Sequence, residues 1–314
     1  MSAPLRVAFF GSPAFGVPVL RRLQAEHEVV LVVTQPDAPA GRGMRVRVPP
    51  VAAEARLSGL PLDQPARVRR DAAFAERLAA VRPDVAITAA YGQILPASLL
   101  RVPEHGFLNA HASLLPDLRG AAPIQWALIL GREETGITVM ETEAGLDTGP
   151  IRHVLRTEVG PTETAPELSA RLSLLAARAI SEALGLLAEG RLPRTPQDDA
   201  KATYAPLLTK EDGDVRWHDD ARDVVNRWRG VLAWPGTRFR RDGRPVRVDL
   251  MDEVAGGPRS GEAGRVLSVG DDGVGVACGR GAVRLRTVTP AGRPSMPAAD
   301  WARGAHLEEG ERLA

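Results

Sequence analysis

The chain has 314 residues, of which 44% are apolar and 25% charged, and its formal net charge is +1. That length suggests about two domains, and these proportions are ordinary for a globular protein and argue against extensive disorder. The single cysteine, Cys278, excludes an intrachain disulfide and a metal site built from several cysteines. A single cysteine also fits a reducing, cytoplasmic setting, which is the location expected. No stretch approaches the ~20 apolar residues of a membrane helix, and no secretory signal is recognisable.

Short apolar runs alternate with helical patterns over the first 190 residues. The strands expected from these runs are residues 5–10, 28–34, 84–90, 106–109, 136–141 and 153–159. The helices expected are residues 14–25, 51–60, 72–82, 121–130 and 165–188. Strands that alternate with helices form βαβ units, so residues 1–189 are predicted to be an α/β domain with a mostly parallel sheet.

The pattern changes after this region. Residues 190–212 are rich in proline and mixed charge without a sustained period, which predicts a linker. A helix is expected over 219–232, followed by closely spaced short strands that indicate a small barrel or sandwich over 213–314. These strands are residues 244–251, 264–269, 274–277 and 282–288, with turns at Asp242-Gly243 and Asp272-Gly273.

Two polar side chains stand at the end of one expected strand. Asn109 and His111 are two residues apart, so an extended backbone places both on one face. Ligands of open α/β sheets bind at the carboxyl ends of strands, where an amide and an imidazole could polarise a carbonyl group and handle a proton. Asp147, after a later strand, could fix the orientation and tautomer of the imidazole. From these residues alone, a purely structural role for His111 is about as well supported as a catalytic role.

Other motifs point away from several enzyme classes. Asp147-Thr148-Gly149 resembles the aspartic-protease motif, but that chemistry needs two aspartates that share a proton, and no second copy occurs. Residues 11–16 match neither a dinucleotide loop nor a P-loop, and they predict a tight turn with Ser12 as the helix N-cap. The histidines show no metal-ligand spacing, so no metal site is expected.

Two segments are locally basic. Residues 35–50 predict either a solvated loop or an arm that touches phosphate, and their arginines are Arg42, Arg45 and Arg47. Residues 222–247 contain eight arginines against two aspartates, with Trp228 and Trp234 between them. This second pattern favours a nucleic-acid surface slightly over a solvated face.

Several segments resemble the methionyl-tRNA formyltransferase family over nearly the whole chain. They are VAFFGSPAFGVPVL at 7–20, TQPDAPAGRG at 34–43, AAYGQILP at 89–96, NAHASLLPDLRGAAPIQWAL at 109–128 and ETGITVMETEAGLDTGPI at 134–151, with looser matches at 227–239 and 289–296. N-x-H, S-L-L-P-x-x-R-G and G-L-D-T-G at these spacings are typical of formyltransferases that use 10-formyltetrahydrofolate. The arginine arm and the basic carboxyl-terminal region select the tRNA enzymes among them.

The resemblance implies a Rossmann-like catalytic domain over 1–189, a linker over 190–212 and an OB-like, tRNA-binding β-barrel domain over 213–314. It implies catalytic roles for Asn109, His111 and Asp147, and folate binding by Ser113, Leu114, Leu115 and Pro116. Together with the local charge, it places tRNA contacts at Arg42, Arg45, Arg47, Arg227, Arg229, Arg238 and Arg240. The expected enzyme is a monomer without a metal that moves a formyl group from 10-formyltetrahydrofolate to methionyl-initiator tRNA. The alternatives are a formyltransferase or hydrolase acting on a small molecule, and an RNA-binding protein without activity.

Overall fold

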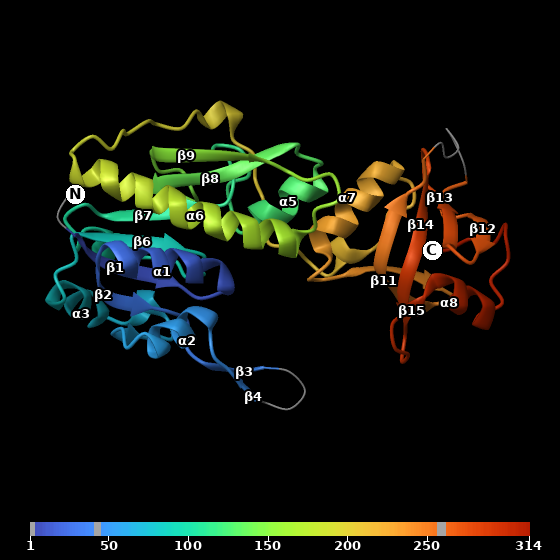
Figure 1. Cartoon of the computed structure of the whole chain (residues 1–314), viewed down its shortest axis with the longest axis horizontal. Helices are drawn as coiled ribbons and strands as arrows, with labels where there is room; N and C mark the ends of the chain where they lie inside the picture. The colour runs from blue at the N-terminus through green and yellow to red at the C-terminus, as the bar shows by residue number, and fades with distance from the viewer. Residues whose placement is uncertain (1–3, 41–44, 256–261) are drawn as a thin grey trace. The chain divides into compact units, whose positions relative to one another are not determined.

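The computed structural model describes residues 4–40, 45–255 and 262–314, and its contacts group into two compact units (Figure 1). Unit 1 comprises Met1–Pro123, Glu134–Glu158 and Ser169–Ala205, and unit 2 comprises Ile124–Glu133, Val159–Leu168 and Pro206–Ala314. The segment predicted as a linker is divided between them, because residues 190–205 belong to unit 1 and residues 206–212 to unit 2.

A seven-stranded sheet forms the centre of unit 1. Its order is β5 (Leu62–Asp63), β2 (Glu28–Val33), β1 (Arg6–Gly11), β6 (Val85–Ala89), β7 (Phe107–His111), β8 (Glu134–Glu141) and β9 (Ile151–Glu158). The first five of these strands are parallel, whereas β8 is antiparallel to both of its neighbours. The predicted α/β class with a mostly parallel sheet is confirmed, and the two-residue β5 is the one strand of this sheet that the sequence did not predict.

Helices cover both faces of this sheet. The helices that include residues of unit 1 are α1 (Val17–Glu26), α2 (Pro50–Leu57), α3 (Phe74–Ala80), α4 (Ala97–Leu100), α5 (Pro123–Ile129) and α6 (Ala165–Ala188). Phe10 of β1 packs against Phe74 of α3, with ring centroids 6.1 Å apart. The neighbouring Phe9 points to the opposite face, where its ring lies near Gly16, ahead of α1. Alternate residues of one strand therefore bury apolar surface against both helical layers.

Loops that follow β1, β2 and β6 are tied together at the carboxyl edge of the sheet. The Ser12 hydroxyl accepts the Gln35 N–H at 3.0 Å and donates to the carbonyl of Tyr91 at 3.3 Å. The Gln35 amide donates to the same Tyr91 carbonyl at 3.1 Å. The prediction that Ser12 caps a helix is wrong, because its side chain makes these contacts between loops and no cap hydrogen bond.

The described residues of unit 2 include an antiparallel sheet and the helices α7 (Ala221–Val231) and α8 (Ala298–Gly304). The sheet order is β10 (Thr237–Arg241), β11 (Arg244–Glu253), β14 (Ala282–Pro290), β13 (Gly273–Ala277) and β12 (Val266–Gly270), and β15 (Met296–Pro297) pairs with β14. The predicted turn between β10 and β11 is confirmed, since Asp242 and Gly243 both have positive φ, at 49° and 73°, as a two-residue type I′ hairpin requires.

Three aromatic rings pack together within the largely aliphatic core of unit 2. Phe239 of β10 lies 5.9 Å from Trp217 and 5.6 Å from Trp301 of α8, measured between ring centroids. Gly230 lets α7 approach α5, because a Cβ atom there would lie 2.8 Å from the carbonyl oxygen of Gln125.

Within the described residues, no helix combines the length and apolarity needed to cross a membrane.

Candidate active site

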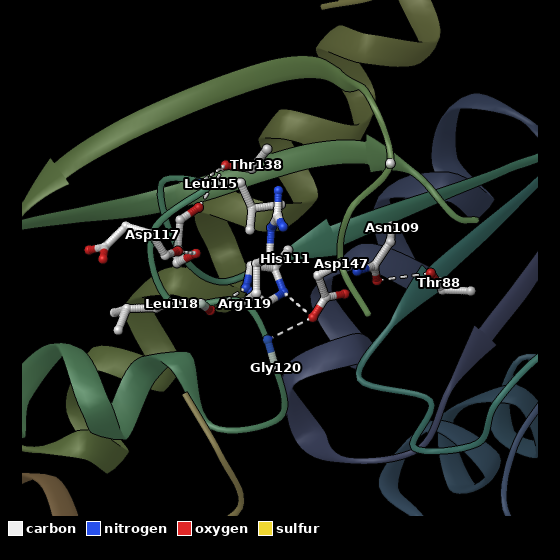
Figure 2. Close-up of polar contacts among 12 residues, drawn as sticks. Thr88, Asn109, His111, Leu115, Asp117, Leu118, Arg119, Gly120, Thr138 and Asp147 are labelled. Carbon is white, nitrogen blue, oxygen red and sulfur yellow. Dashed lines mark hydrogen bonds and ion pairs between the residues drawn. The ribbon is translucent and has the colours of Figure 1, made fainter. Parts of the chain in front are cut away.

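The end of β7 presents Asn109 and His111 on one face, as the sequence predicts (Figure 2). The strand lies between β6, to which it is parallel, and β8, to which it is antiparallel. Hydrogen bonds on both sides therefore fix the backbone that carries the two side chains. His111 is buried, whereas Asn109 is half-buried and accessible to a ligand.

The amide group of Asn109 has a defined orientation. Thr88 of β6 is its register partner, and the Thr88 hydroxyl donates to Asn109 Oδ1 at 2.9 Å (Figure 2). Because Oδ1 accepts this bond, Nδ2 is the end of the amide that faces away from Thr88. Within the described part of the chain Nδ2 has no hydrogen-bond partner, so it is free to donate to a ligand.

His111 is oriented by a main-chain carbonyl group. Its Nε2 donates to the carbonyl oxygen of Leu118 at 2.9 Å, and since that oxygen only accepts, the neutral imidazole carries its hydrogen on Nε2. Nδ1 lies 3.6 Å from Oδ2 of Asp147, which is too long for a direct hydrogen bond. The sequence prediction assigned the choice of tautomer to Asp147. In the structure Leu118 makes that choice, and Asp147 faces the nitrogen that remains able to take up a proton.

Asp147 lies in a loop whose backbone conformation is unusual. Its φ is 52°, in the left-handed region that non-glycine residues rarely occupy. Oδ2 accepts the Gly120 N–H at 2.8 Å (Figure 2). Gly120 itself requires glycine, because its φ is 118° and a Cβ atom would lie 2.7 Å from the carbonyl oxygen of Ala205.

The segment predicted to bind folate uses its polar groups within the protein. Ser113 is buried, and its hydroxyl donates to the carbonyl of Asp117 at 2.6 Å. Thr138 of β8 donates to the Ser113 carbonyl at 2.7 Å and accepts the Leu115 N–H at 3.1 Å. The Leu114 side chain packs against Gly136 of β8. The segment is thus a rigid wall beside His111, and the Ser113 hydroxyl is engaged with its own loop.

The predicted arginine arm is a β-hairpin in its described part. β3 (Ala38–Ala40) and β4 (Arg45–Arg47) pair in antiparallel fashion. Arg42 lies outside the described residues. Arg45 and Arg47 begin and end β4, and the register pairs them with Ala40 and Ala38. Arg47 is exposed to solvent.

The assignment of Arg229 to an RNA-binding surface needs correction. Arg229 is only 5% exposed, and its guanidinium donates to the carbonyls of Gly160 at 2.9 Å and Pro161 at 3.0 Å and to Asn226 Oδ1 at 2.6 Å. Burial lowers the pKa of Arg229, and the nearby positive charge of Arg222 lowers it further. Arg229 therefore connects α7 to residues 160–163 instead of facing solvent.

The other carboxyl-terminal arginines differ in accessibility. Arg227 is mostly buried, with its side chain 12% exposed and Nη1 3.7 Å from Oδ1 of Asp212. Arg238 is half-exposed and pairs with Asp214 at 2.7 Å. Arg240 is exposed and donates to the Gly243 carbonyl at 3.0 Å. Of the four, Arg238 and Arg240 are the ones accessible to a large ligand.

We expect replacement of Arg229 by Met to lower the free energy of unfolding of unit 2 by about 2–4 kcal/mol, because it leaves the buried Asn226 Oδ1 and the partly buried carbonyls of Gly160 and Pro161 without their donor. Chemical denaturation followed by tryptophan fluorescence measures this change, since Trp217, Trp228 and Trp301 are buried in unit 2. The exposed Arg240→Met is the control and should change stability by less than about 0.5 kcal/mol. Equal stability of the two variants would refute the structural role of Arg229.

A groove of about 240 Å³ opens in unit 2 beside Arg238. Three guanidinium side chains border it, and small residues and prolines form the rest of its lining: Pro235, Gly236, Arg238, Pro245, Arg247, Thr289, Pro290, Ala291, Gly292 and Arg293. Arg247 pairs with Asp249 at 2.7 Å, whereas Arg293 is exposed and has no ion pair within the described residues. Arg293 is not among the arginines predicted from the sequence to contact tRNA.

The arrangement at β7 brings together an amide donor, an imidazole nitrogen and a carboxylate at the carboxyl end of a parallel strand. Such a set can hold a carbonyl oxygen and move a proton beside it. In the part of the chain that the structure describes, no group of three or more His, Cys, Asp or Glu side chains is placed to hold a metal ion.

Comparison with known families agrees with this chemistry. Residues 5–184 match the formyl transferase family, and residues 207–306 match the carboxyl-terminal domain of formyl transferases. The first match covers more than half of the chain. The chain therefore belongs to the formyl transferase family.

Individual relatives narrow the assignment. A methionyl-tRNA formyltransferase of Deinococcus radiodurans is 52% identical over 308 residues, which are 98% of this chain and 95% of that protein. One of Thermus thermophilus is 47% identical over 310 residues, covering 98% and 99% of the two chains. Among the formyl transferases, the chain is a member of the methionyl-tRNA formyltransferases.

Solved structures with low sequence identity share the fold. HypX from Aquifex aeolicus in complex with tetrahydrofolic acid superposes with a TM-score of 0.65 at 18% identity, over 99% of this chain and 51% of that chain. An N-formyltransferase from Helicobacter canadensis gives a TM-score of 0.69 at 11% identity, over 90% of this chain and 98% of that chain.

Proposed function

We propose that the chain transfers the formyl group of 10-formyltetrahydrofolate to the α-amino group of methionine on initiator tRNA, as a cytoplasmic monomer. The observation that carries the proposal is the convergence of Asn109, His111 and Asp147, with one free amide donor and one imidazole nitrogen facing a carboxylate. The names of relatives at 47–52% identity support formyl transfer to methionyl-tRNA.

The first chemical step is attack of the amine on the formyl carbon. A carbon–nitrogen bond forms, and the electron pair of the formyl C=O bond moves onto its oxygen. Asn109 Nδ2 can donate to that oxygen from an orientation that Thr88 fixes before the reaction begins. Once His111 has taken up the proton of the attacking amine on Nδ1, that hydrogen can provide a second donor to the same oxygen.

The second requirement is the transfer of one proton from the attacking nitrogen to the leaving nitrogen. Asp147 can accept the amine proton, and His111 can hold it on Nδ1, because Nε2 already carries the hydrogen bound to Leu118. The bond from the formyl carbon to N10 breaks as the C=O bond re-forms, and N10 takes up the proton. Electrons and protons balance without a redox change.

The donor folate is proposed to bind at the carboxyl edge of the sheet, where open α/β sheets hold ligands. Ser113, Leu114, Leu115 and Pro116 would form one wall of this site. Because the polar groups of Ser113 and Leu115 are satisfied internally, their contribution would be shape and rigidity.

The tRNA is proposed to contact the β3–β4 hairpin and the arginines of unit 2. The arginines proposed to bind its phosphates are Arg42, Arg45 and Arg47 of residues 35–50, together with Arg238 and Arg240 of the sheet. The antiparallel sheet of unit 2 is proposed to curve into an OB-like barrel that binds the tRNA. Its groove beside Arg293 offers a further phosphate site, with prolines against which a ribose or base can pack.

We expect Arg293→Ala to raise the KM for tRNA about 3–10-fold while kcat at saturating tRNA stays unchanged. Loss of one phosphate contact should also reduce the slope of log affinity against log salt by about 1. Filter binding from low to high salt measures the slope. Arg303→Ala, which removes an exposed arginine of α8 outside the groove, is the matched control. An unchanged slope for Arg293→Ala would exclude the groove from the tRNA site.

The experiment that tests the function is a panel of acceptors. The protein is mixed with 10-formyltetrahydrofolate and methionyl-initiator tRNA, free methionine, uncharged tRNA or glycinamide ribonucleotide, and the products are identified by mass spectrometry. Formylation of the charged initiator tRNA alone is expected. Formylation of a small amine, or release of formate without an acceptor, would instead support the small-molecule formyltransferase or hydrolase. RNA binding without any turnover would support a non-enzymatic RNA-binding protein.

A further inference from the structure

Gln197 bridges two loops of unit 1 from within the segment that the sequence predicts to be a linker. Its amide nitrogen donates to the main-chain carbonyls of Asp147 and Gly149, both at 2.8 Å. Its amide oxygen accepts two bonds from Arg119, from Nε at 3.0 Å and from Nη2 at 2.8 Å. The orientation of the amide is therefore fixed, since only its nitrogen can donate to carbonyls and only its oxygen can accept from a guanidinium.

Arg119 is itself held firmly. It is 2% exposed, and its Nη2 also pairs with Asp199 at 2.7 Å. The main chain of Arg119 donates to the Thr203 carbonyl at 2.9 Å and accepts the Ala205 N–H at 2.7 Å. A buried guanidinium with this many partners is a rigid support for the Gln197 amide.

Both ends of this bridge reach Asp147, one at its side chain and the other at its main chain. Gly120 follows Arg119 and binds Oδ2 of Asp147, as Figure 2 shows, while Gln197 binds the Asp147 carbonyl. The Asp147 side chain and its main chain are thus both fixed to one network. This matters because the left-handed φ of Asp147 persists only if the surroundings hold it. The adjacent residues 143–146 are exposed to solvent.

We propose that Gln197, supported by Arg119, is a positioning residue that holds Asp147 opposite His111 during formyl transfer. The proposal rests on the proposed function of the same site. Gln197 lies 50 residues from Asp147 in the sequence and touches no reacting group, so it acts through the geometry of the Asp147 loop. A displacement of about 1 Å in a catalytic group can cost 10²-fold in rate.

The first test is Gln197→Leu, which keeps the approximate volume and removes all four hydrogen bonds of the amide. We expect kcat to fall about 10–100-fold, with the KM values for both substrates changed by less than about twofold. Gln197→Glu is the second variant. It preserves the acceptor for Arg119 but places an oxygen against the carbonyls of Asp147 and Gly149, so a comparable loss is expected. Wild-type kcat in both variants would overturn the proposal.

A double-mutant cycle tests whether Gln197 acts through Asp147. In the Asp147→Asn background, Gln197→Leu should lower kcat by less than about twofold, because the group that it positions is already inactive. If the two losses multiply in full, Gln197 does not act through Asp147, and the proposal fails.

Arg6 provides a matched control at the opposite edge of the sheet. Its guanidinium donates to the carbonyls of Val81 at 2.9 Å and Arg82 at 3.1 Å, and Arg82 also has a left-handed φ, at 46°. Arg6→Leu therefore removes the same kind of support from a strained loop far from β7's carboxyl end. Its kcat should stay within about twofold of wild type, so an equal fall in kcat for Arg6→Leu and Gln197→Leu would indicate general destabilisation and overturn the proposal.

Amide hydrogen exchange gives a readout that does not need activity. Gln197→Leu should speed exchange about tenfold in peptides that cover residues 142–150, whereas Arg6→Leu should leave those peptides unchanged. Unchanged exchange in Gln197→Leu would refute the positioning role even if the wild-type protein formylates no tRNA. Faster exchange with wild-type kcat would equally refute it, because the loop would then move without consequence for catalysis.

Discussion

Asp147→Asn is expected to lower kcat for formylation of methionyl-initiator tRNA by about 10²–10⁴-fold. The substituted amide has nearly the same shape and can still accept the Gly120 N–H through its oxygen. It carries no charge to stabilise a protonated His111 and cannot accept the proton of the attacking amine. If its NH₂ group turns toward Nδ1 of His111, it also occupies the nitrogen that takes up the proton.

Single-turnover kinetics with saturating enzyme measures this loss at the chemical step. Asp71→Asn is the matched control, because it removes a carboxylate that pairs with Arg77 at 2.7 Å on the exterior of unit 1. The control should retain wild-type kcat, and the thermal midpoint of Asp147→Asn should stay within a few degrees of wild type. Near-normal turnover by Asp147→Asn would remove Asp147 from the proton pathway and leave it a structural role in the loop.

The central strands of unit 1 were predictable because they are buried on both faces. Parallel strands covered by helices contain continuous apolar runs, such as the one that became β2. β10 of unit 2 was missed although its sequence alternates. Thr237 and Phe239 are buried, while Arg238 and Arg240 between them are accessible, so the arginines obscured the period-two pattern of a strand.

The candidate site was predictable where its groups are side chains at or after the ends of expected strands, as Asn109, His111 and Asp147 are. Asn109 and His111 were found from their spacing on one strand. The groups that orient them were not, because the Leu118 carbonyl and the Gly120 N–H are main-chain groups that every residue type possesses. Thr88 acts across the sheet, and its role depends on a register that the sequence does not state.

The local positive charge around Arg229 led to the wrong prediction that its side chain lies on an RNA-binding surface. Arg229 was counted with the basic residues of 222–247, but its position in α7 carried an opposing signal. Val225 is one helical turn earlier and is buried, as is Trp228 beside it. Residues four apart lie on the same face of a helix, so the apolar face of α7 already predicts that Arg229 points inward.

Asn109 is the proposed donor to the oxyanion that forms during formyl transfer. Asn109→Ala is expected to lower kcat by about 10²–10³-fold, the usual cost of removing one fixed donor to a developing oxyanion. The fold should remain intact, because the Thr88 hydroxyl keeps the Leu108 carbonyl at 3.4 Å as an alternative acceptor. The KM for folate should change little, since the donor contributes mainly when charge develops on the formyl oxygen.

Thr88→Val separates the presence of the Asn109 donor from its orientation. It keeps the amide but removes the hydroxyl that binds Oδ1, so the amide can rotate and present either end to the formyl oxygen. A smaller loss of about 3–30-fold is expected, and Thr88→Ser, which retains the hydroxyl, should recover most of it. Measurement of kcat and of KM for each substrate in Asn109→Ala, Thr88→Val and Thr88→Ser distinguishes loss of the donor from loss of its orientation. If Asn109→Ala lowers only substrate affinity, the amide binds the ground state, and the oxyanion must be stabilised by His111 alone.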